Sequence, residues 1–209
     1  MLTAALVGNG PSAHGKGDEI DAHDFVVRMN SFWTHNTDSG RKMSAYAGAA
    51  RPINDAPSWV LEDLRWEYWV QMPAEHVTWK VGRSAVSMCR VLGDVNGRPL
   101  RFFREELVDA AVELLLKVAE PRPEGPYFTC GLSCLFMLLD YPVKFDVIHL
   151  YGFDGTNENY RYNTGVKLVR RCHDFSAEKR LIDMLLPGSR MHVPLTPEEG
   201  GPADVQTTE

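Results

Sequence analysis

The chain has 209 residues, of which 44% are hydrophobic and 24% are charged, a composition typical of one globular domain with a sizeable core. Its net charge of −6 argues against a nucleic-acid partner, because each neutralised phosphate requires a Lys or Arg side chain. The sequence shows no signal peptide and no apolar run long enough to span a bilayer, so we expect a cytoplasmic protein, with peripheral membrane contact left open.

The first third of the sequence predicts alternating strands and helices. Short apolar runs bounded by turn residues predict strands at residues 2–7, 25–29, 44–49 and 67–71. Residues 55–66 are expected to form a helix. The first strand is stopped by Gly8-Asn9-Gly10-Pro11, which interrupts the apolar pattern.

The rest of the sequence continues this alternation. Apolar residues at helical spacing predict a helix at 104–119, and a second helix is expected at 132–140. A buried strand at 145–151 is ended by Gly152, and a helix at 176–186, capped by Ser176, precedes a short strand at 191–193. Alternating strands and helices predict an α/β fold with a parallel sheet and helices on both faces. We expect a single domain over residues 1–195 and a flexible tail at 196–209.

The four cysteines are expected to be reduced thiols. They are Cys89, Cys130, Cys134 and Cys172, and they form neither a CxxC pair nor a cluster of the kind that binds zinc. Two disulfides are the alternative.

The turn after the first strand is the first candidate binding element. In parallel α/β sheets, ligands bind at the carboxyl ends of the strands. Glycines in Gly8-Asn9-Gly10-Pro11-Ser12 allow the backbone to approach a ligand closely, and amides at such a turn can face an anion. The segment is neither a Walker loop nor a GxGxxG motif, and a plain tight turn would also explain it.

Two further elements end on the same predicted edge. Arg28 and Asn30 follow an apolar strand, and the Asn amide can both donate and accept hydrogen bonds to a base or ribose. Thr129-Cys130-Gly131 opens a helix, where hydroxyl and backbone donors suit a carboxylate or phosphate. The alternatives are an edge-strand Arg with a turn Asn, and ordinary helix capping by Thr129.

His173 is the candidate general base. It stands just before a predicted helix, and an unperturbed imidazole pKa near 6.5 suits proton transfer at neutral pH. A structural histidine is the alternative reading of this residue taken alone.

Taken in chain order, four segments resemble the large, small and very small sialylmotifs of glycosyltransferase family 29. They are Val7-Gly8-Asn9-Gly10-Pro11-Ser12, Ile20-Asp21-x-His23-Asp24-x-Val26-x-Arg28-x-Asn30, Leu150-Tyr151-Gly152-Phe153 and His173-x4-Glu178. The Gly-Asn-Gly-Pro-Ser run and the element Tyr127-Phe128-Thr129-x-Gly131 are also similar to the bacterial sialyltransferases of family 42. The resemblance extends from Ala5 to about Leu186.

The resemblance implies a Rossmann-like fold of GT-A type, a CMP-sugar donor, a glycan acceptor and catalysis without a metal or another cofactor. It implies His173 as the general base, and Tyr160 and Tyr162 resemble the tyrosines that hold the leaving phosphate in the bacterial family. The donor-binding residues expected on this basis are Gly8, Asn9, Gly10, Pro11, Ser12, Arg28, Asn30, Thr129, Cys130, Gly131, Gly152, Phe153 and Asp154. The absence of any DxD sequence agrees with a metal-free mechanism.

The sequence also departs from the animal members of the family. Those enzymes carry a membrane anchor and a disulfide between the large and small motifs, whereas Ala4 and Ala5 stand where the large-motif Cys would lie. Asn159 stands near the position of the His that precedes the Tyr pair in their third motif.

Sialic acid is the expected donor sugar, and a related ulosonic sugar such as Kdo is the alternative. Two other readings stay open: a catalytically inactive nucleotide-binding α/β module, and an unrelated Rossmann-type enzyme such as a methyltransferase. The lack of GxGxG after the first strand counts against the methyltransferase.

Overall fold

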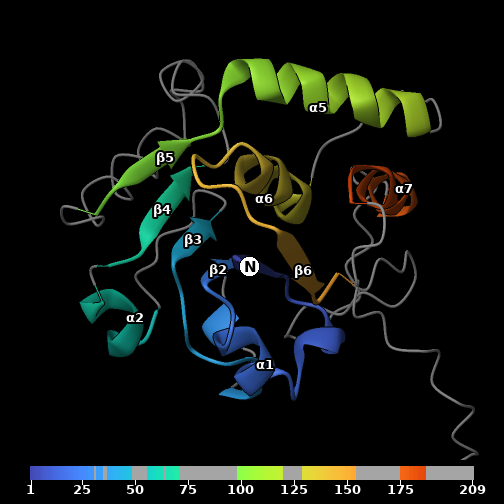
Figure 1. The fold of residues 1–209 in the computed structure, drawn as a ribbon. Helices are drawn as coiled ribbons and strands as arrows, with labels where there is room; N and C mark the ends of the chain where they lie inside the picture. The colour runs from blue at the N-terminus through green and yellow to red at the C-terminus, as the bar shows by residue number, and fades with distance from the viewer. Residues whose placement is uncertain are drawn as a thin grey trace, which may run out of the picture.

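The computed structural model describes residues 1–30, 32–34, 37–48, 56–63, 65–70, 98–119, 129–153 and 175–186. Within these residues, six parallel strands form one sheet in the order β5-β4-β3-β2-β1-β6 (Figure 1). The strands are β1 (Thr3–Val7), β2 (Phe25–Met29), β3 (Ala45–Gly48), β4 (Glu67–Val70), β5 (Leu100–Phe102) and β6 (Val147–Tyr151).

The strand order reverses at β1. The chain moves outward from β1 through β2, β3, β4 and β5, and then returns to place β6 on the other side of β1. In the register of the sheet, Val7 pairs with Arg28 on one side and with Tyr151 on the other. The turns that follow β1, β2 and β6 therefore meet at the carboxyl edge of the sheet, where α/β proteins of this kind bind ligands.

Helices cover both faces of the sheet. Figure 1 shows α5, α6 and α7 over one face and α1 and α2 over the other. Their bounds are α1 (Gly17–Asp21), α2 (Ser58–Glu62), α5 (Glu105–Val118), α6 (Cys130–Leu139) and α7 (Phe175–Leu185). None of the described helices is long and apolar enough to cross a lipid bilayer.

The core follows from the two-residue period of the strands. In β1, Ala4 and Leu6 pack with the α5, α6 and α7 side, whereas Ala5 and Val7 pack with Ile20 of α1 on the other. β1 is therefore apolar on both faces, as a central parallel strand must be. Helix α6 is buried from Gly131 to Leu138. A helix that is apolar on all sides in this way belongs between two layers.

The structure confirms the predicted α/β class with a parallel sheet, and five of the six strands lie within two residues of their predicted bounds. Strand β5 was not predicted, because three residues are too few to show an alternating pattern. The predicted strand at 191–193 and the tail at 196–209 lie outside the described residues. Cys130 and Cys134 form no disulfide with another described residue.

Two predicted helix ends are wrong. Helix α2 stops at Glu62 instead of continuing to residue 66. At Asp63 the backbone is extended, and the carboxylate accepts hydrogen bonds from the Arg65 backbone N (3.0 Å) and Nε (2.8 Å), which compete with helix continuation. Helix α7 begins at Phe175, so Ser176 lies inside its first turn and is not the cap.

Candidate functional site

The turns after β1 and β6 are joined by backbone hydrogen bonds at the carboxyl edge. Gly8 N donates to Tyr151 O (2.7 Å), and Gly10 N donates to Gly152 O (3.0 Å). A Cβ on Gly8 would lie 2.6 Å from Gly152 O, so the two turns approach too closely for a larger residue. The glycines noted in the sequence are therefore required by this close approach of two main chains.

Ser12 completes this junction. It lies in the short 3₁₀ helix Pro11–Ala13, and its Oγ accepts a hydrogen bond from Gly152 N (2.9 Å). Gly152 has a positive φ of 69°, a conformation that favours glycine. Ser12 thus shapes the turn at Gly152, and its contact with the donor stays a prediction.

The N-terminus of α6 lies beside the same turns. A Cβ on Gly131 would come within 2.7 Å of the Phe153 ring, so the ring packs directly on the first turn of α6. The Cys130 Sγ lies 3.4 Å from Oδ1 of Asn30, which follows β2. The structure therefore brings together the ends of β1, β2 and β6 and the start of α6, as the sequence predicted.

Two asparagines lie at this edge, one with a left-handed backbone conformation and one with a buried side chain. Asn30 has φ 53°, and its backbone N donates to Ala47 O (2.9 Å), which holds the turn after β2 against β3. Asn9 is only 8% exposed, and its Oδ1 has no hydrogen-bond partner among the described residues. Buried polar atoms are rarely left unpaired, because the loss of their hydration costs roughly 1–3 kcal/mol. The Asn9 Oδ1 atom can therefore accept a hydrogen bond from a group that does not belong to the described residues.

Thr129 is occupied by the protein itself. Its backbone N donates to Glu178 Oε1 (2.7 Å), its hydroxyl donates to Glu178 Oε2, and the same Oγ1 accepts from Leu132 N (3.2 Å). The carboxylate expected at this helix start is therefore the 5%-exposed side chain of Glu178 on α7, and not that of a ligand. Thr129 therefore connects α6 to α7, and its expected place in the nucleotide pocket stays a prediction.

Arg28 has a structural role among the described residues, and its contact with the donor stays a prediction. The side chain is fully buried, and it donates to Lys42 O (2.8 Å), Ser39 O (2.8 Å) and Asp21 Oδ1 (3.1 Å). Burial lowers the pKa of Arg28 to about 10, and the nearby Asp21 carboxylate opposes this shift. Arg28 therefore fixes the loop at residues 39–42.

A chain of hydrogen bonds that links buried His23 and Tyr151 to Glu19 was not recognised in the sequence. Tyr151 OH donates to Glu19 Oε1 (3.0 Å), so its oxygen must accept from His23 Nε2 (2.9 Å), and neutral His23 carries its proton on that nitrogen. The His23 ring lies 4.6 Å from that of His149. Both His23 and Tyr151 stand inside the motif segments, but no spacing rule shows that residues 128 positions apart will meet.

This cluster predicts a loss of stability in acid. Burial, and then the neighbouring His149, lower the pKa of His23, although Glu19 opposes them. The neutral ring is favoured in the fold, so its stabilising contribution is complete above pH 6.5 and is lost as the pH falls through the lower folded pKa. We expect the free energy of unfolding, measured in urea between pH 5 and 7.5, to depend less on pH for His23→Gln than for the wild type. His14→Gln, at an exposed position, should leave the dependence unchanged; equal curves for all three proteins would refute the assignment.

Four predicted site residues lie outside the described part of the chain: Asp154, Tyr160, Tyr162 and His173. Their roles stay predictions. Among the described residues, no three His, Cys, Asp or Glu side chains are grouped as metal ligands.

Comparisons with solved structures give the same architecture. A mammalian sialyltransferase matches with a TM-score of 0.57 at 20% identity, covering 88% of this chain and 65% of that one. The monofunctional α-2,3-sialyltransferase Cst-I from Campylobacter jejuni matches with a TM-score of 0.58 at 14% identity, covering 88% of this chain and 72% of that one. CstII from Campylobacter jejuni, in complex with CMP-3FNeuAc, matches with a TM-score of 0.53 at 15% identity, covering 91% of this chain and 78% of that one.

These likenesses confirm the predicted Rossmann-like, GT-A-type fold. This chain spans 65% of the length of the mammalian structure. A comparison with curated protein sequences gives no match. The family model described as glycosyltransferase family 29 (sialyltransferase) matches residues 1–188, which include every motif segment and all of the described strands. The chain therefore belongs to glycosyltransferase family 29, the sialyltransferases.

Proposed function

We propose that this chain transfers sialic acid, or a related ulosonic sugar such as Kdo, from a CMP-activated donor to a hydroxyl of a glycan acceptor. The observation that carries the proposal is Asn9, a buried side chain with an acceptor left unpaired by the described residues, at the junction of the β1 and β6 turns. A nucleotide with amino and hydroxyl donors would satisfy that acceptor at the edge where α/β folds bind nucleotides. Family membership supports the choice of a CMP-sugar.

The described residues suggest how the donor is held. Asn9 and Asn30 supply amides to CMP, and Cys130, Gly131 and Phe153 form the neighbouring wall around the start of α6. Gly8 and Gly152 allow the β1 and β6 turns to pack against each other, and this close packing fixes the shape of the edge at which we propose the nucleotide binds. Pro11 begins the 3₁₀ helix that follows.

The chemical step needs a base and a stabilised leaving group. His173 takes the proton of the acceptor hydroxyl while the acceptor oxygen forms a bond to the anomeric carbon of the sugar. The bond from that carbon to the phosphate oxygen breaks, and CMP leaves with the electron pair. Tyr160 and Tyr162 donate hydrogen bonds to the leaving phosphate, so the reaction proceeds without a metal.

Donor binding is tested by calorimetry with CMP, UMP and GDP. Asn30→Gly is the informative variant, because glycine accepts φ 53° without strain and only the amide is lost. We expect CMP to bind most tightly, and Asn30→Gly to weaken it by about 1–3 kcal/mol, the cost of a lost buried polar contact. Tighter binding of UMP or GDP would overturn the proposed donor class.

Turnover is tested by CMP release from CMP-sialic acid and from CMP-Kdo, each with and without EDTA. We expect release with at least one donor in the presence of an acceptor glycan, at the same rate after chelation. A larger rate with CMP-Kdo would identify the alternative sugar. CMP binding without any release would instead indicate an inactive nucleotide-binding module, and loss of activity in EDTA with recovery in Mn²⁺ would overturn the metal-free mechanism.

A further inference from the structure

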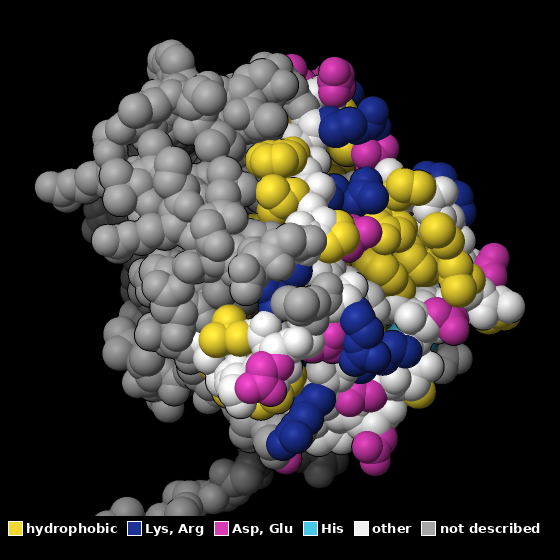
Figure 2. Space-filling model, turned by 90° about the vertical axis from the view of Figure 1, so that its left-hand side faces the viewer, with side chains coloured by type: hydrophobic (Ala, Val, Ile, Leu, Met, Phe, Trp, Pro, Cys, Tyr) yellow, Lys and Arg dark blue, Asp and Glu magenta, His cyan; other side chains and the backbone are white. Residues whose placement is uncertain are grey.

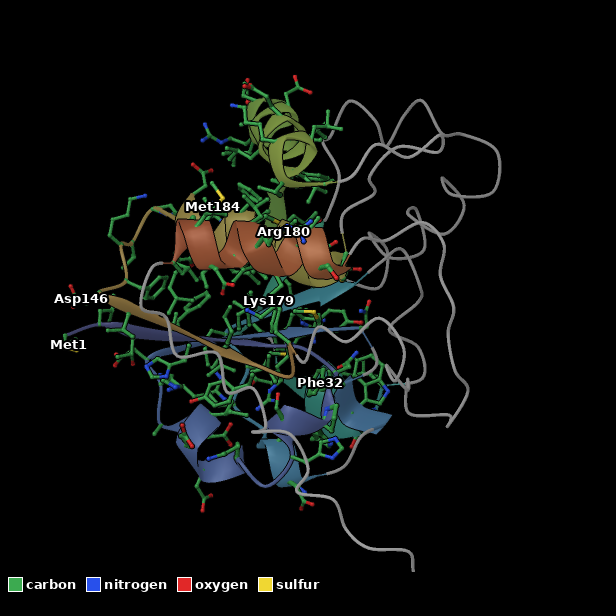
Figure 3. All side chains as sticks on the ribbon, turned by 90° about the vertical axis from the view of Figure 1, so that its right-hand side faces the viewer. Met1, Phe32, Asp146, Lys179, Arg180 and Met184 are labelled. Carbon is green, nitrogen blue, oxygen red and sulfur yellow. The ribbon has the colours of Figure 1, made fainter. Side chains whose placement is uncertain are left out.

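A cavity lies at the amino-terminal edge of the sheet, opposite the candidate donor site. Its volume is about 580 Å³, within the range of small-ligand sites. It is bounded by Phe25 at the start of β2, Glu67 at the start of β4 and Tyr141 just after α6. Figure 3 shows the separation of the two edges, with Met1 and Asp146 at the amino-terminal edge and Phe32 beyond the carboxyl end of β2.

The walls of this cavity combine aromatic rings with cations. The Phe25 and Tyr141 rings pack with centroids 4.8 Å apart, and Trp59 of α2 stands on another side. The Arg41 guanidinium lies over the Trp59 ring, 5.7 Å from its centroid. On the face seen in Figure 2, hydrophobic side chains gather beside Lys, Arg and acidic side chains of the described residues.

The carboxylates in the walls are neutralised by other protein groups. Asp63 forms two hydrogen bonds with the Arg65 guanidinium, both of 2.8 Å, which lower the pKa of Asp63 to about 2. Glu67 accepts from Tyr141 OH (2.9 Å), Trp69 Nε1 (3.0 Å) and Arg101 Nε (3.3 Å).

The charged side chains of Arg41 and Lys42 have no such hydrogen-bonded partner of opposite charge among the described residues. Among the described residues, neither side chain forms an ion pair with a carboxylate: Arg41 lies over Trp59, and the Lys42 ammonium donates to the His23 carbonyl. The lining holds three cations, Arg41, Lys42 and Arg65, against the two carboxylates Asp63 and Glu67, and this excess of one positive charge favours an anion.

The backbone that carries these cations is fixed in advance. The Asp21 carboxylate accepts from the backbone N of Arg41 (2.7 Å) and of Lys42 (2.9 Å). The buried Arg28 side chain also donates a hydrogen bond from Nε to the Lys42 carbonyl. A ligand that binds here does not have to order this loop, which reduces the entropic cost of binding.

We propose that this cavity binds the carboxylated ring of an acidic sugar, as a non-catalytic site on the opposite edge of the sheet from the donor site. The carboxylate faces Arg41 and Lys42, and the apolar side of the sugar ring packs on Trp59 and the Phe25–Tyr141 pair. An acidic sugar is the anion that a member of a sialyltransferase family meets on glycans. The site does not depend on CMP binding or on His173, so it can be tested separately from the proposed reaction.

The test is a two-dimensional NMR titration that follows the indole N–H of Trp59, assigned with Trp59→Phe. The probes are 3′-sialyllactose, lactose and inorganic phosphate. We expect 3′-sialyllactose alone to shift the Trp59 signal at millimolar concentration. Exposed ion pairs each contribute weakly, so the loss of both cations in Arg41→Gln with Lys42→Gln should weaken binding roughly tenfold.

Lys117→Gln is the matched control, because it removes one exposed cation on α5, outside the cavity, and should leave the affinity unchanged. An equal response to lactose would overturn the proposal, because the carboxylate would then contribute nothing. An equal response to phosphate would also overturn it, because the ring would contribute nothing. Unchanged affinity in the Arg41 and Lys42 variant would show that the sugar binds elsewhere. CMP release measured on the same samples reports on the proposed function independently.

Discussion

His173→Ala is expected to lower the rate of sugar transfer roughly 10²- to 10⁴-fold, the usual contribution of a positioned general base. His173 precedes the first residue of α7 by two positions in the sequence. The first turn of α7 is tied to the start of α6 through the Glu178–Thr129 hydrogen bonds, and Cys130 of α6 contacts Asn30. The end of α7 that follows His173 therefore lies at the same edge as the asparagines proposed to bind the donor.

The measurement is single-turnover CMP release from CMP-sialic acid at saturating acceptor, because this isolates the chemical step from product release. A base role predicts that CMP affinity changes little in His173→Ala, and that the wild-type rate rises with pH as the imidazole loses its proton. In His173→Ala, the transfer rate should no longer increase with pH. His14→Ala, at an exposed position, is the control and should behave as the wild type. Unchanged turnover in His173→Ala would remove it from the mechanism.

The sequence was informative where one local signal determines the structure. Apolar runs ended by glycine predicted β1 and β6, because a buried parallel strand needs both an apolar run and a stop. The meeting of their ends was also predictable, because parallel strands share one carboxyl edge. Asn9 and Asn30 were correctly placed at that edge for this reason.

The sequence was less informative where a side chain finds a partner far away in the chain. Thr129 shows the pattern expected of an anion-binding helix start, and it does hold a carboxylate, but the carboxylate belongs to Glu178, 49 residues away. Arg28 was predicted at a strand end, as a contact to the donor or as an edge-strand Arg, and the structure shows that Asp21 and the loop at 39–42 enclose it. A local pattern shows which group is needed at such a position, and only the packing of the chain shows whether the protein or a ligand supplies it.

Gly152→Ala is expected to destabilise the fold by roughly 2–5 kcal/mol and to abolish CMP binding. Two costs add. A left-handed φ in a residue with a Cβ costs about 1–2 kcal/mol, and Gly152 has φ 69°. Overpacking costs about 1–3 kcal/mol, and the new Cβ would lie 2.5 Å from Gly8 O, a backbone atom that cannot turn aside.

Gly15→Ala separates these two costs. Gly15 has almost the same backbone conformation, with φ 71°, but a Cβ there would meet no atom within 4 Å. Backbone strain should therefore lower the free energy of unfolding of this variant by only about 1–2 kcal/mol, and its CMP affinity should not change. Urea unfolding of both variants gives the difference, and calorimetry gives the affinities. Equal destabilisation would mean that the β1 and β6 turns can move apart at no cost, in which case the close approach of Gly8 and Gly152 would not define the shape of the donor site.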